Sequence, residues 1–265
     1  MVSNAMSNKD KIHQQIISYW DSVATPYHDT EIGEINASPD ILCKELELDA
    51  LHRALNPDVD TREIGCGNGH NLFELQKTFT GSLTGLDVSA QMIKSAKTRN
   101  ADINFITSDI LTDLPFEHTF SQAFSVRCLI NIHPFENQLH ALSQIASLLN
   151  MGGVVALIEP TLQSLHQLNE LRTTVGLEEI ELRWHNLYID EEQFLDNLPG
   201  ELELEYIDRF SSTYYLASRS FNAIATPRGE SPDYRSAINQ AGRLLPSFGD
   251  FGPHKMFVLR KVCPT

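Results

Sequence analysis

Segments with the residue pattern of helices alternate along the chain with segments typical of strands. The helical interval of three and four residues covers 9–28, 41–55, 134–149, 162–174 and 191–197. Between these stretches, short strand candidates lie at 59–62, 82–87, 103–110, 120–126, 153–158, 201–207 and 255–262. Because helices separate most of the predicted strands, we predict an α/β fold built on a mostly parallel sheet.

The first predicted strand runs into a glycine-rich turn, Glu63-Ile64-Gly65-Cys66-Gly67-Asn68-Gly69, and a helical stretch begins at His70. Glycine allows a positive φ and brings no Cβ against a ligand, and the helix N-terminus offers unpaired N–H groups. This arrangement predicts a ligand-binding turn. A dinucleotide fingerprint would need G-x-G-x-x-G, and His70 occupies the place of its third glycine.

Two acidic residues end the next two predicted strands. Asp87 lies 18 residues after Gly69, close to where a nucleotide-binding β-α-β unit has its ribose-binding carboxylate. The alternative is that Asp87 caps the helix that follows, although Ser89 can supply that cap. Asp109 ends the strand at 103–110 in the same way.

The glycine turn preceded by an acid, together with Asp87 and Asp109, resembles the motifs of class I S-adenosylmethionine (SAM) dependent methyltransferases, and this resemblance covers 59–160. It implies SAM as cofactor, S-adenosylhomocysteine (SAH) as product, and Asp109 at the adenine amino group. It also implies a Rossmann-like seven-stranded sheet in the order 3-2-1-4-5-7-6, with the last strand antiparallel. The implied cofactor-binding residues are Glu63, Gly65, Cys66, Gly67, Asn68, Gly69, Asp87, Val88, Met92, Asp109, Ile110 and Arg127.

The stretch from Tyr19 to Tyr27 resembles the W-x3-A-x2-Y leader of many small-molecule methyltransferases. In that family the leader folds over the cofactor, and its tyrosine faces the methionine end or the substrate, which gives Tyr27 a catalytic role. The alternative is that Trp20 and Tyr27 only anchor the first helix to the core.

Length and composition predict one domain spanning 6–265. Residues 1–5 read as an expression-tag remnant, 6–56 as a helical leader, 57–160 as the SAM-binding core and 255–262 as the final strand. The region 161–254 holds the substrate-side elements. Two stretches, 160–190 and 209–254, are surplus to a minimal fold. They are placed to cover a substrate, because ligands of open α/β sheets bind beyond the strand ends.

Charge and cysteine usage narrow the partners. The net charge of −15 argues against nucleic acid, which needs a basic face. No apolar run reaches the length of a membrane span. Four cysteines without a C-x-x-C pair indicate neither a zinc site nor a disulfide framework, so we expect a cytoplasmic protein without a metal. The resemblance implies a bacterial protein with a small-molecule substrate, and we expect a monomer or a homodimer.

Methyl transfer from a sulfonium needs alignment of the reactants and removal of one proton. His185 and Glu159 are the catalytic candidates beside Tyr27, because both lie in segments that follow strand ends. The candidate substrate-binding residues are Tyr19, Asn186, Tyr188, Tyr214 and Tyr215. Plainer interpretations stay open: His185 in a surface loop, Glu159 as a solvated or capping carboxylate, and the tyrosine pair 214–215 in the core of a strand-like run. Arg127 could bind an anionic substrate group or the cofactor carboxylate, and the competing interpretation is a surface salt bridge.

Four functions compete. We favour a methyltransferase for a small molecule, since the runs 127–131, 184–190 and 212–219 resemble a bacterial group with such roles. The alternatives are a NAD-binding oxidoreductase, a SAM-binding protein that does not methylate or serves as a sensor, and a methyltransferase for protein or tRNA.

Overall fold

The computed structural model describes residues 8–24, 39–99, 102–112, 114, 119–227 and 229–263. Seven strands form one sheet in the order β3-β2-β1-β4-β5-β7-β6. Strand β7 is antiparallel to both neighbours, and the other pairs are parallel, so the topology implied by the sequence motifs is confirmed. The strands are β1 (Thr61–Ile64), β2 (Leu83–Asp87), β3 (Asn104–Thr107), β4 (Phe120–Val126), β5 (Leu149–Pro160), β6 (Leu202–Asp208) and β7 (His254–Lys261).

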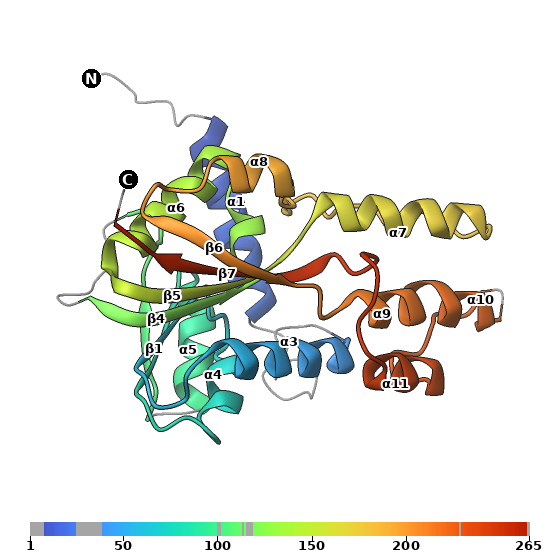
Figure 1. Ribbon diagram of the computed structural model, residues 1–265, viewed down its shortest axis with the longest axis horizontal. Helices are drawn as coiled ribbons and strands as arrows, with labels where there is room; N and C mark the ends of the chain where they lie inside the picture. Colours follow the sequence, from blue (N-terminus) through green and yellow to red (C-terminus); the bar gives the residue numbers. More distant parts are fainter. Residues whose placement is uncertain are drawn as a thin grey trace.

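Helices cover both faces of the sheet (Figure 1). One face carries α3 (Ile41–Ala54), α4 (His70–Leu75) and α5 (Ala90–Arg99), and the opposite face carries α6 (Phe135–Leu148) and α8 (Glu191–Asp196). Helix α1 (Asn8–Ala24) packs against α5. Among the described helices, none combines the length and apolar composition that crossing a bilayer requires.

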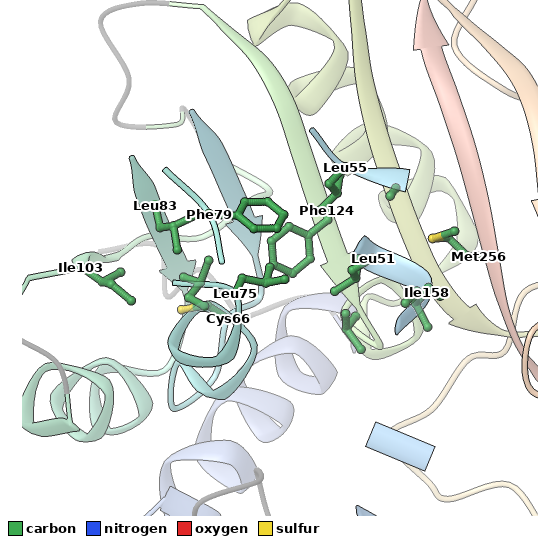
Figure 2. Close-up of a cluster of buried hydrophobic side chains, with 14 of the residues drawn as sticks. Leu51, Leu55, Cys66, Leu75, Phe79, Leu83, Ile103, Phe124, Ile158 and Met256 are labelled. Carbon is green, nitrogen blue, oxygen red and sulfur yellow. The ribbon is translucent and has the colours of Figure 1, made fainter. Parts of the chain in front are cut away.

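The core consists of two apolar layers separated by the sheet. Successive side chains of β5 point to opposite faces, so Val155 and Leu157 join the α6 layer while Ala156 and Ile158 join the α3 layer. Figure 2 shows the α3 layer, where Phe124 lies beside Phe79 and among Leu51, Leu55 and Leu75. A sheet buried on both faces explains why β5 carries a continuous apolar run from Val154 to Ile158.

The two surplus stretches fold mainly into helices beyond the end of β5. Helix α7 (Leu162–Thr174) leaves β5 directly, and α9 (Ser212–Tyr215), the π-helix η2 (Leu216–Phe221), α10 (Asn222–Ala225) and α11 (Ala237–Leu244) follow β6. Figure 1 shows α7, α9, α10 and α11 together on that side of the molecule. The strand-like interpretation of the tyrosine pair at 214–215 is therefore wrong, because tertiary packing there selects a helix.

Backbone hydrogen bonds pin the segment after α7 across the ends of two strands. Leu187 N donates to the carbonyl of Ile130 at 2.6 Å, just after β4, and Ile189 N donates to the carbonyl of Pro160 at 3.0 Å, at the end of β5. The fully buried ammonium of Lys255 pairs with Glu191 at 2.5 Å and with Asp250 at 2.7 Å. The surplus segments are thus fixed to the sheet edge at which parallel α/β proteins bind ligands.

Candidate active site

A cavity of about 420 Å³ lies at the carboxyl ends of the central strands. This volume falls in the range of small-molecule and cofactor sites. One half is walled by the glycine turn and the ends of β2 and β3. The other half is walled by α3, the start of β7, the 180–188 segment and η2.

The glycine turn has the backbone conformation that its sequence predicts. Gly65, Gly67 and Gly69 all have positive φ, at 72°, 53° and 77°. A Cβ on Gly65 would come within 2.4 Å of Cys128 Sγ, and one on Gly69 within 2.6 Å of Phe105 Cζ. Neighbouring side chains therefore already occupy the space that larger residues would need, and Gly65 and Gly67 line the cavity.

Asp87 holds the glycine turn and faces the cavity. Its carboxylate accepts hydrogen bonds from the backbone N–H of Gly67 and of Ser89, each at 2.8 Å. Ser89 Oγ in turn accepts from Met92 N at 3.1 Å, so the serine supplies the helix cap. Burial raises the pKa of Asp87 to about 6, although the two N–H donors act in the opposite direction. A carboxylate has about four acceptor positions, so two remain for ribose hydroxyls.

Asp109 lies on the other side of the same half-cavity. Its carboxylate contacts His13 Nε2 of α1 at 2.7 Å and accepts from Leu111 N at 2.9 Å. The His13 hydrogen bond and charge lower the pKa of Asp109, against the effect of burial. Helix α1 is also held by Trp20 Nε1, which donates to Asn131 Oδ1 at 3.2 Å.

The residues of this half-cavity fit SAM. Apolar side chains suited to a purine line the wall between the two carboxylates, and they are Leu86, Val88, Met92 and Ile110. Asp87 and Asp109 would hold the ribose and the adenine amino group, and the glycine turn leaves room for the methionine part. Helix α1 covers this half from outside, since His13, Ile16 and Trp20 line it too.

The predicted cofactor residues divide into two groups. The cavity is lined by Gly65, Gly67, Asp87, Val88, Met92, Asp109, Ile110 and Arg127. The others stand behind it, and they are Glu63, Cys66, Asn68 and Gly69. Glu63 is buried and accepts from Asn71 Nδ2 at 2.7 Å, and burial raises its pKa to about 8. Glu63 therefore stabilises the glycine turn from behind and does not line the cavity.

His185 lines the cavity and is only 3% exposed. Its ring stacks on Tyr19 with centroids 4.5 Å apart and meets the edges of Trp20 and Trp184 at 5.8 and 5.3 Å. Its Nδ1 makes no hydrogen bond within the described residues. Burial, and next the charges of Arg183 and His133, lower its pKa below 6.5, so the imidazole is neutral at physiological pH and can accept a proton.

Glu159, for which a catalytic role is predicted, does not line the cavity. Its carboxylate accepts from the backbone N–H groups of Cys128, Leu129 and Ile130, at 3.0, 2.9 and 3.3 Å. It is 1% exposed and absent from the cavity lining, and burial raises its pKa to about 7. The capping interpretation therefore describes its position: Glu159 fixes the turn after β4.

Glu159→Ala should lower the free energy of unfolding by roughly 3 kcal/mol or more, because three buried N–H groups lose their acceptor. Glu159→Gln keeps one carbonyl oxygen and should lose roughly half as much. Urea denaturation of the two variants measures the difference. Equal stability of wild type and Glu159→Ala would contradict the capping role.

The sequence analysis missed a charged face of α3. Asp40, Cys43, Lys44 and Glu47 line the cavity, and their i, i+3, i+4, i+7 spacing puts them on one helix face. Asp40 caps the helix by accepting from Cys43 N at 3.1 Å. The spacing was visible in the sequence, but charged residues on such a face are usually exposed to solvent.

Glu47 is the centre of this buried group. It is 0% exposed and pairs with Lys44 at 2.9 Å, with His254 Nδ1 at 3.0 Å and with Arg127 Nε at 3.4 Å. His254 Nε2 then accepts from the hydroxyl of Tyr215 at 3.1 Å. Arg127, with φ of 56°, has a positive φ that no other non-glycine residue in the described part of the chain shares. Such backbone strain is most often found at functional sites.

The remaining predicted residues are found in several places. Asn186, Tyr188 and Tyr215 line the cavity, so the 180–188 segment and the end of α9 do reach the substrate side. Tyr19 stacks on His185 behind the lining. Tyr214 is buried, and its hydroxyl donates to Asp40, which is a core position rather than a pocket wall. Tyr27 lies outside the described residues.

Comparison with known proteins gives a family and a set of similar folds. The family described as methyltransferase domain matches residues 62–153, from β1 into β5. No curated protein matches the sequence significantly.

Solved structures resemble the whole chain at low identity. A chain from the complex between the Haloferax volcanii Trm112 methyltransferase activator and a methyltransferase is 17% identical, with a TM-score of 0.61, over 92% of this chain and 97% of that one. Geranyl diphosphate C-methyltransferase from Streptomyces coelicolor A3(2), in complex with SAH, is 13% identical, with a TM-score of 0.58, over 95% and 98%. Magnesium protoporphyrin IX methyltransferase from Synechocystis PCC 6803, with bound SAM, is 12% identical, with a TM-score of 0.55, over 98% and 100%. These likenesses show a shared fold.

Proposed function

Since the chain belongs to the class I SAM-dependent methyltransferases, we propose that it transfers the methyl group of SAM to a small-molecule acceptor. One observation carries the proposal. The half-cavity that fits SAM continues into a second half-cavity, which α3 and the surplus segments enclose. A molecule in that second half would lie against the cofactor site and away from bulk water, which methyl transfer requires.

Size and charge support a small acceptor over RNA or a protein. The net charge of −15 disfavours a polyanionic substrate. Side chains from α3, β7 and η2 line the acceptor half of a cavity of about 420 Å³, which is a size typical of pockets for small ligands. The acceptor atom, whether O, N or C, is left open by this arrangement.

The chain contributes position and one proton acceptor to the reaction. SAM supplies a methyl group already activated on a sulfonium. Asp87, Asp109 and the glycine turn hold it, and the acceptor half holds the nucleophile beside it. We assign proton removal to His185, whose unpaired Nδ1 and lowered pKa suit a base at neutral pH.

His185→Ala should lower kcat about a hundredfold or more, because general-base assistance typically contributes that much. Its affinity for SAH should change less than about threefold, since His185 lies outside the cofactor half. In the wild type, kcat should rise with pH through a value below the usual histidine pKa of about 6.5. Full turnover in His185→Ala would remove it from the base role.

The matched comparison is His254→Asn, because His254, like His185, is an imidazole that lines the acceptor half of the cavity. Its contacts with Glu47 and Tyr215 form a second route for a proton. Loss of turnover in His254→Asn but not in His185→Ala would move the base to that route. SAH binding without turnover of any acceptor, by the wild type or either variant, would favour the alternative that the protein binds SAM without methylating.

A further inference from the structure

The acceptor half of the cavity is basic, although the protein is strongly acidic. Arg127, Arg183 and Arg219 line it together with Lys44, while the acids lining the same half are Asp40, Glu47 and Glu181. The arginines come from three separate elements: the turn after β4, the 180–188 segment and η2. In a chain of net charge −15, this local excess of positive charge sets the acceptor half apart.

Arg219 is held in a fixed orientation with donors to spare. Its guanidinium lies 4.9 Å from the ring centroids of both Tyr215 and Tyr234. It donates to Asp40 at 2.5 Å and to Ser218 Oγ at 3.1 Å. A guanidinium has five N–H donors in a planar fork, so three remain. A pre-oriented arginine of this kind loses little entropy when it binds an anion.

Tyr188 provides a hydroxyl at the same place. It lies in the cavity wall, and its hydroxyl makes no hydrogen bond to any residue that the structure describes. Arg127, Arg183 and Arg219 line the same cavity. Burial raises the pKa of Tyr188, and the charges of these three arginines act in the opposite direction. A hydroxyl in a wall shared with three guanidinium groups is suited to donate to an anion bound there.

The carboxylates of the acceptor half compensate only part of this positive charge, because three acids stand against four bases. Asp40 pairs with Arg219, and Glu47 is shared by Lys44, Arg127 and His254. Arg183 has no carboxylate within salt-bridge distance among the described residues. Glu181, which is exposed, is the third acid that lines the acceptor half.

The same charges argue against a cation in the acceptor half. Cys43, Glu47 and His254 offer ligand atoms within 4.8 Å of one another. However, Lys44 and Arg127 already neutralise Glu47, and a divalent ion there would lie beside two positive groups. The polar group of the acceptor half is thus arranged for a negative ligand.

We infer that Arg183, Tyr188 and Arg219 form an oxyanion subsite, which binds a carboxylate or phosphate group carried by the methyl acceptor. The inference rests on the proposed function and names its substrate class. Anchoring the acceptor by its anion would place the rest of the molecule between η2 and the cofactor half. The fork of Arg219 gives two parallel N–H donors to one oxyanion, which a neutral amide cannot match.

Calorimetric titration of the SAH-saturated protein with benzoate, phenyl phosphate and the neutral benzamide tests the subsite. At least one of the two anions should bind about tenfold tighter than benzamide or better, as expected for charge-assisted hydrogen bonds. The stronger of the two identifies the oxyanion as a carboxylate or a phosphate. If neither anion binds better than benzamide, including the case in which no probe binds, the inference is wrong.

Two variants locate the effect. Arg219→Gln and the exposed Arg183→Gln should each reduce the anion preference to about threefold or less, with SAH affinity unchanged. Arg183→Gln keeps the test valid if Arg219→Gln fails to fold. The matched control is Arg53→Gln, whose guanidinium pairs with Asp208 outside the cavity.

Three results would overturn the assignment. If Arg219→Gln or Arg183→Gln lowers the affinity for SAH as much as the affinity for the anion, these arginines bind the cofactor. If Arg53→Gln loses the same anion preference, the overall charge of the protein, and not the subsite, causes that preference. An anion preference that persists in both subsite variants would place the anion elsewhere. Failure of the proposed function would instead appear as wild-type protein that binds no SAH or methylates nothing.

Discussion

Asp87→Ala should weaken SAH binding at least about tenfold, because charge-assisted hydrogen bonds contribute roughly 1.5–3 kcal/mol. The carboxylate does two things that alanine cannot do. It accepts from Gly67 N and so orients the glycine turn, and its remaining acceptor positions face the cavity. Calorimetric titration of wild type and variant with SAH measures the change. Unchanged affinity would exclude Asp87 from ribose binding.

The pH dependence of binding provides a second readout of the same carboxylate. Burial raises the pKa of Asp87 to about 6, so the free protein becomes protonated there as the pH falls through that value. A neutral carboxyl group loses acceptor capacity. SAH affinity should therefore be about tenfold weaker near pH 5 than near pH 8, since about one molecule in ten is then ionised.

Asp87→Asn is the matched control for this pH effect. Asparagine has nearly the same shape as aspartate but does not titrate, so the weaker SAH affinity of this variant should be nearly independent of pH. A wild-type affinity that stays level across the same range would mean that another group dominates ribose binding. A wild-type pH profile in the Asp87→Asn variant would show the same.

Gly65→Ala should lower the free energy of unfolding by roughly 2–5 kcal/mol and abolish measurable SAH binding. Two costs add at this position. Gly65 has φ of 72°, which L-residues with a Cβ rarely adopt, and the new methyl would lie 2.4 Å from Cys128 Sγ and 2.5 Å from its Cβ. The turn would have to move, and the Gly67–Asp87 hydrogen bond depends on it. Urea denaturation and SAH titration measure the two effects.

Gly176→Ala separates the two costs. Gly176 has φ of 79°, close to that of Gly65, but a Cβ there would meet nothing within 4 Å. It should lose only the roughly 1–2 kcal/mol of the left-handed conformation and keep SAH affinity. If both variants lose the same free energy of unfolding, the contact with Cys128 does not destabilise Gly65→Ala. The turn would then be more adaptable than its geometry indicates.

The cofactor half could be predicted from sequence because its residues are close together in the chain and their types are constrained. A positive φ selects glycine in the turn, and a parallel strand that ends in an acid places Asp87 beside it. The spacing of these residues along the chain is therefore enough to predict their positions in the cofactor half. Strand order followed from the resemblance, since hydrophobic period alone does not distinguish the place of β7.

The acceptor half could be predicted only in part because its contacts join distant segments. Glu47 and His254 are 207 residues apart, and only tertiary packing brings them within 3.0 Å. Glu159 shows the same limitation: its three N–H partners lie 29–31 residues away, and its position at the end of β5 suited either catalysis or capping.

Arg62 shows how a charged residue is accommodated in a central strand. Strand β1 lies in the middle of the sheet. The Arg62 guanidinium lies over the Phe120 ring, 5.9 Å from the centroid, and the residue is partly exposed near the start of the strand. The long apolar stem lets arginine occupy such a place.

Calorimetric titration of the purified protein with SAH, with NAD as control, tests the central claim most directly. The glycine turn, Asp87 and Asp109 predict saturable SAH binding with a dissociation constant on the order of micromolar and no binding of NAD. Binding of NAD and not SAH would contradict the account, because the turn with His70 in place of a third glycine would then accept a pyrophosphate. Absence of heat with both ligands would contradict it as well, since the cavity would not be a cofactor site in the free protein.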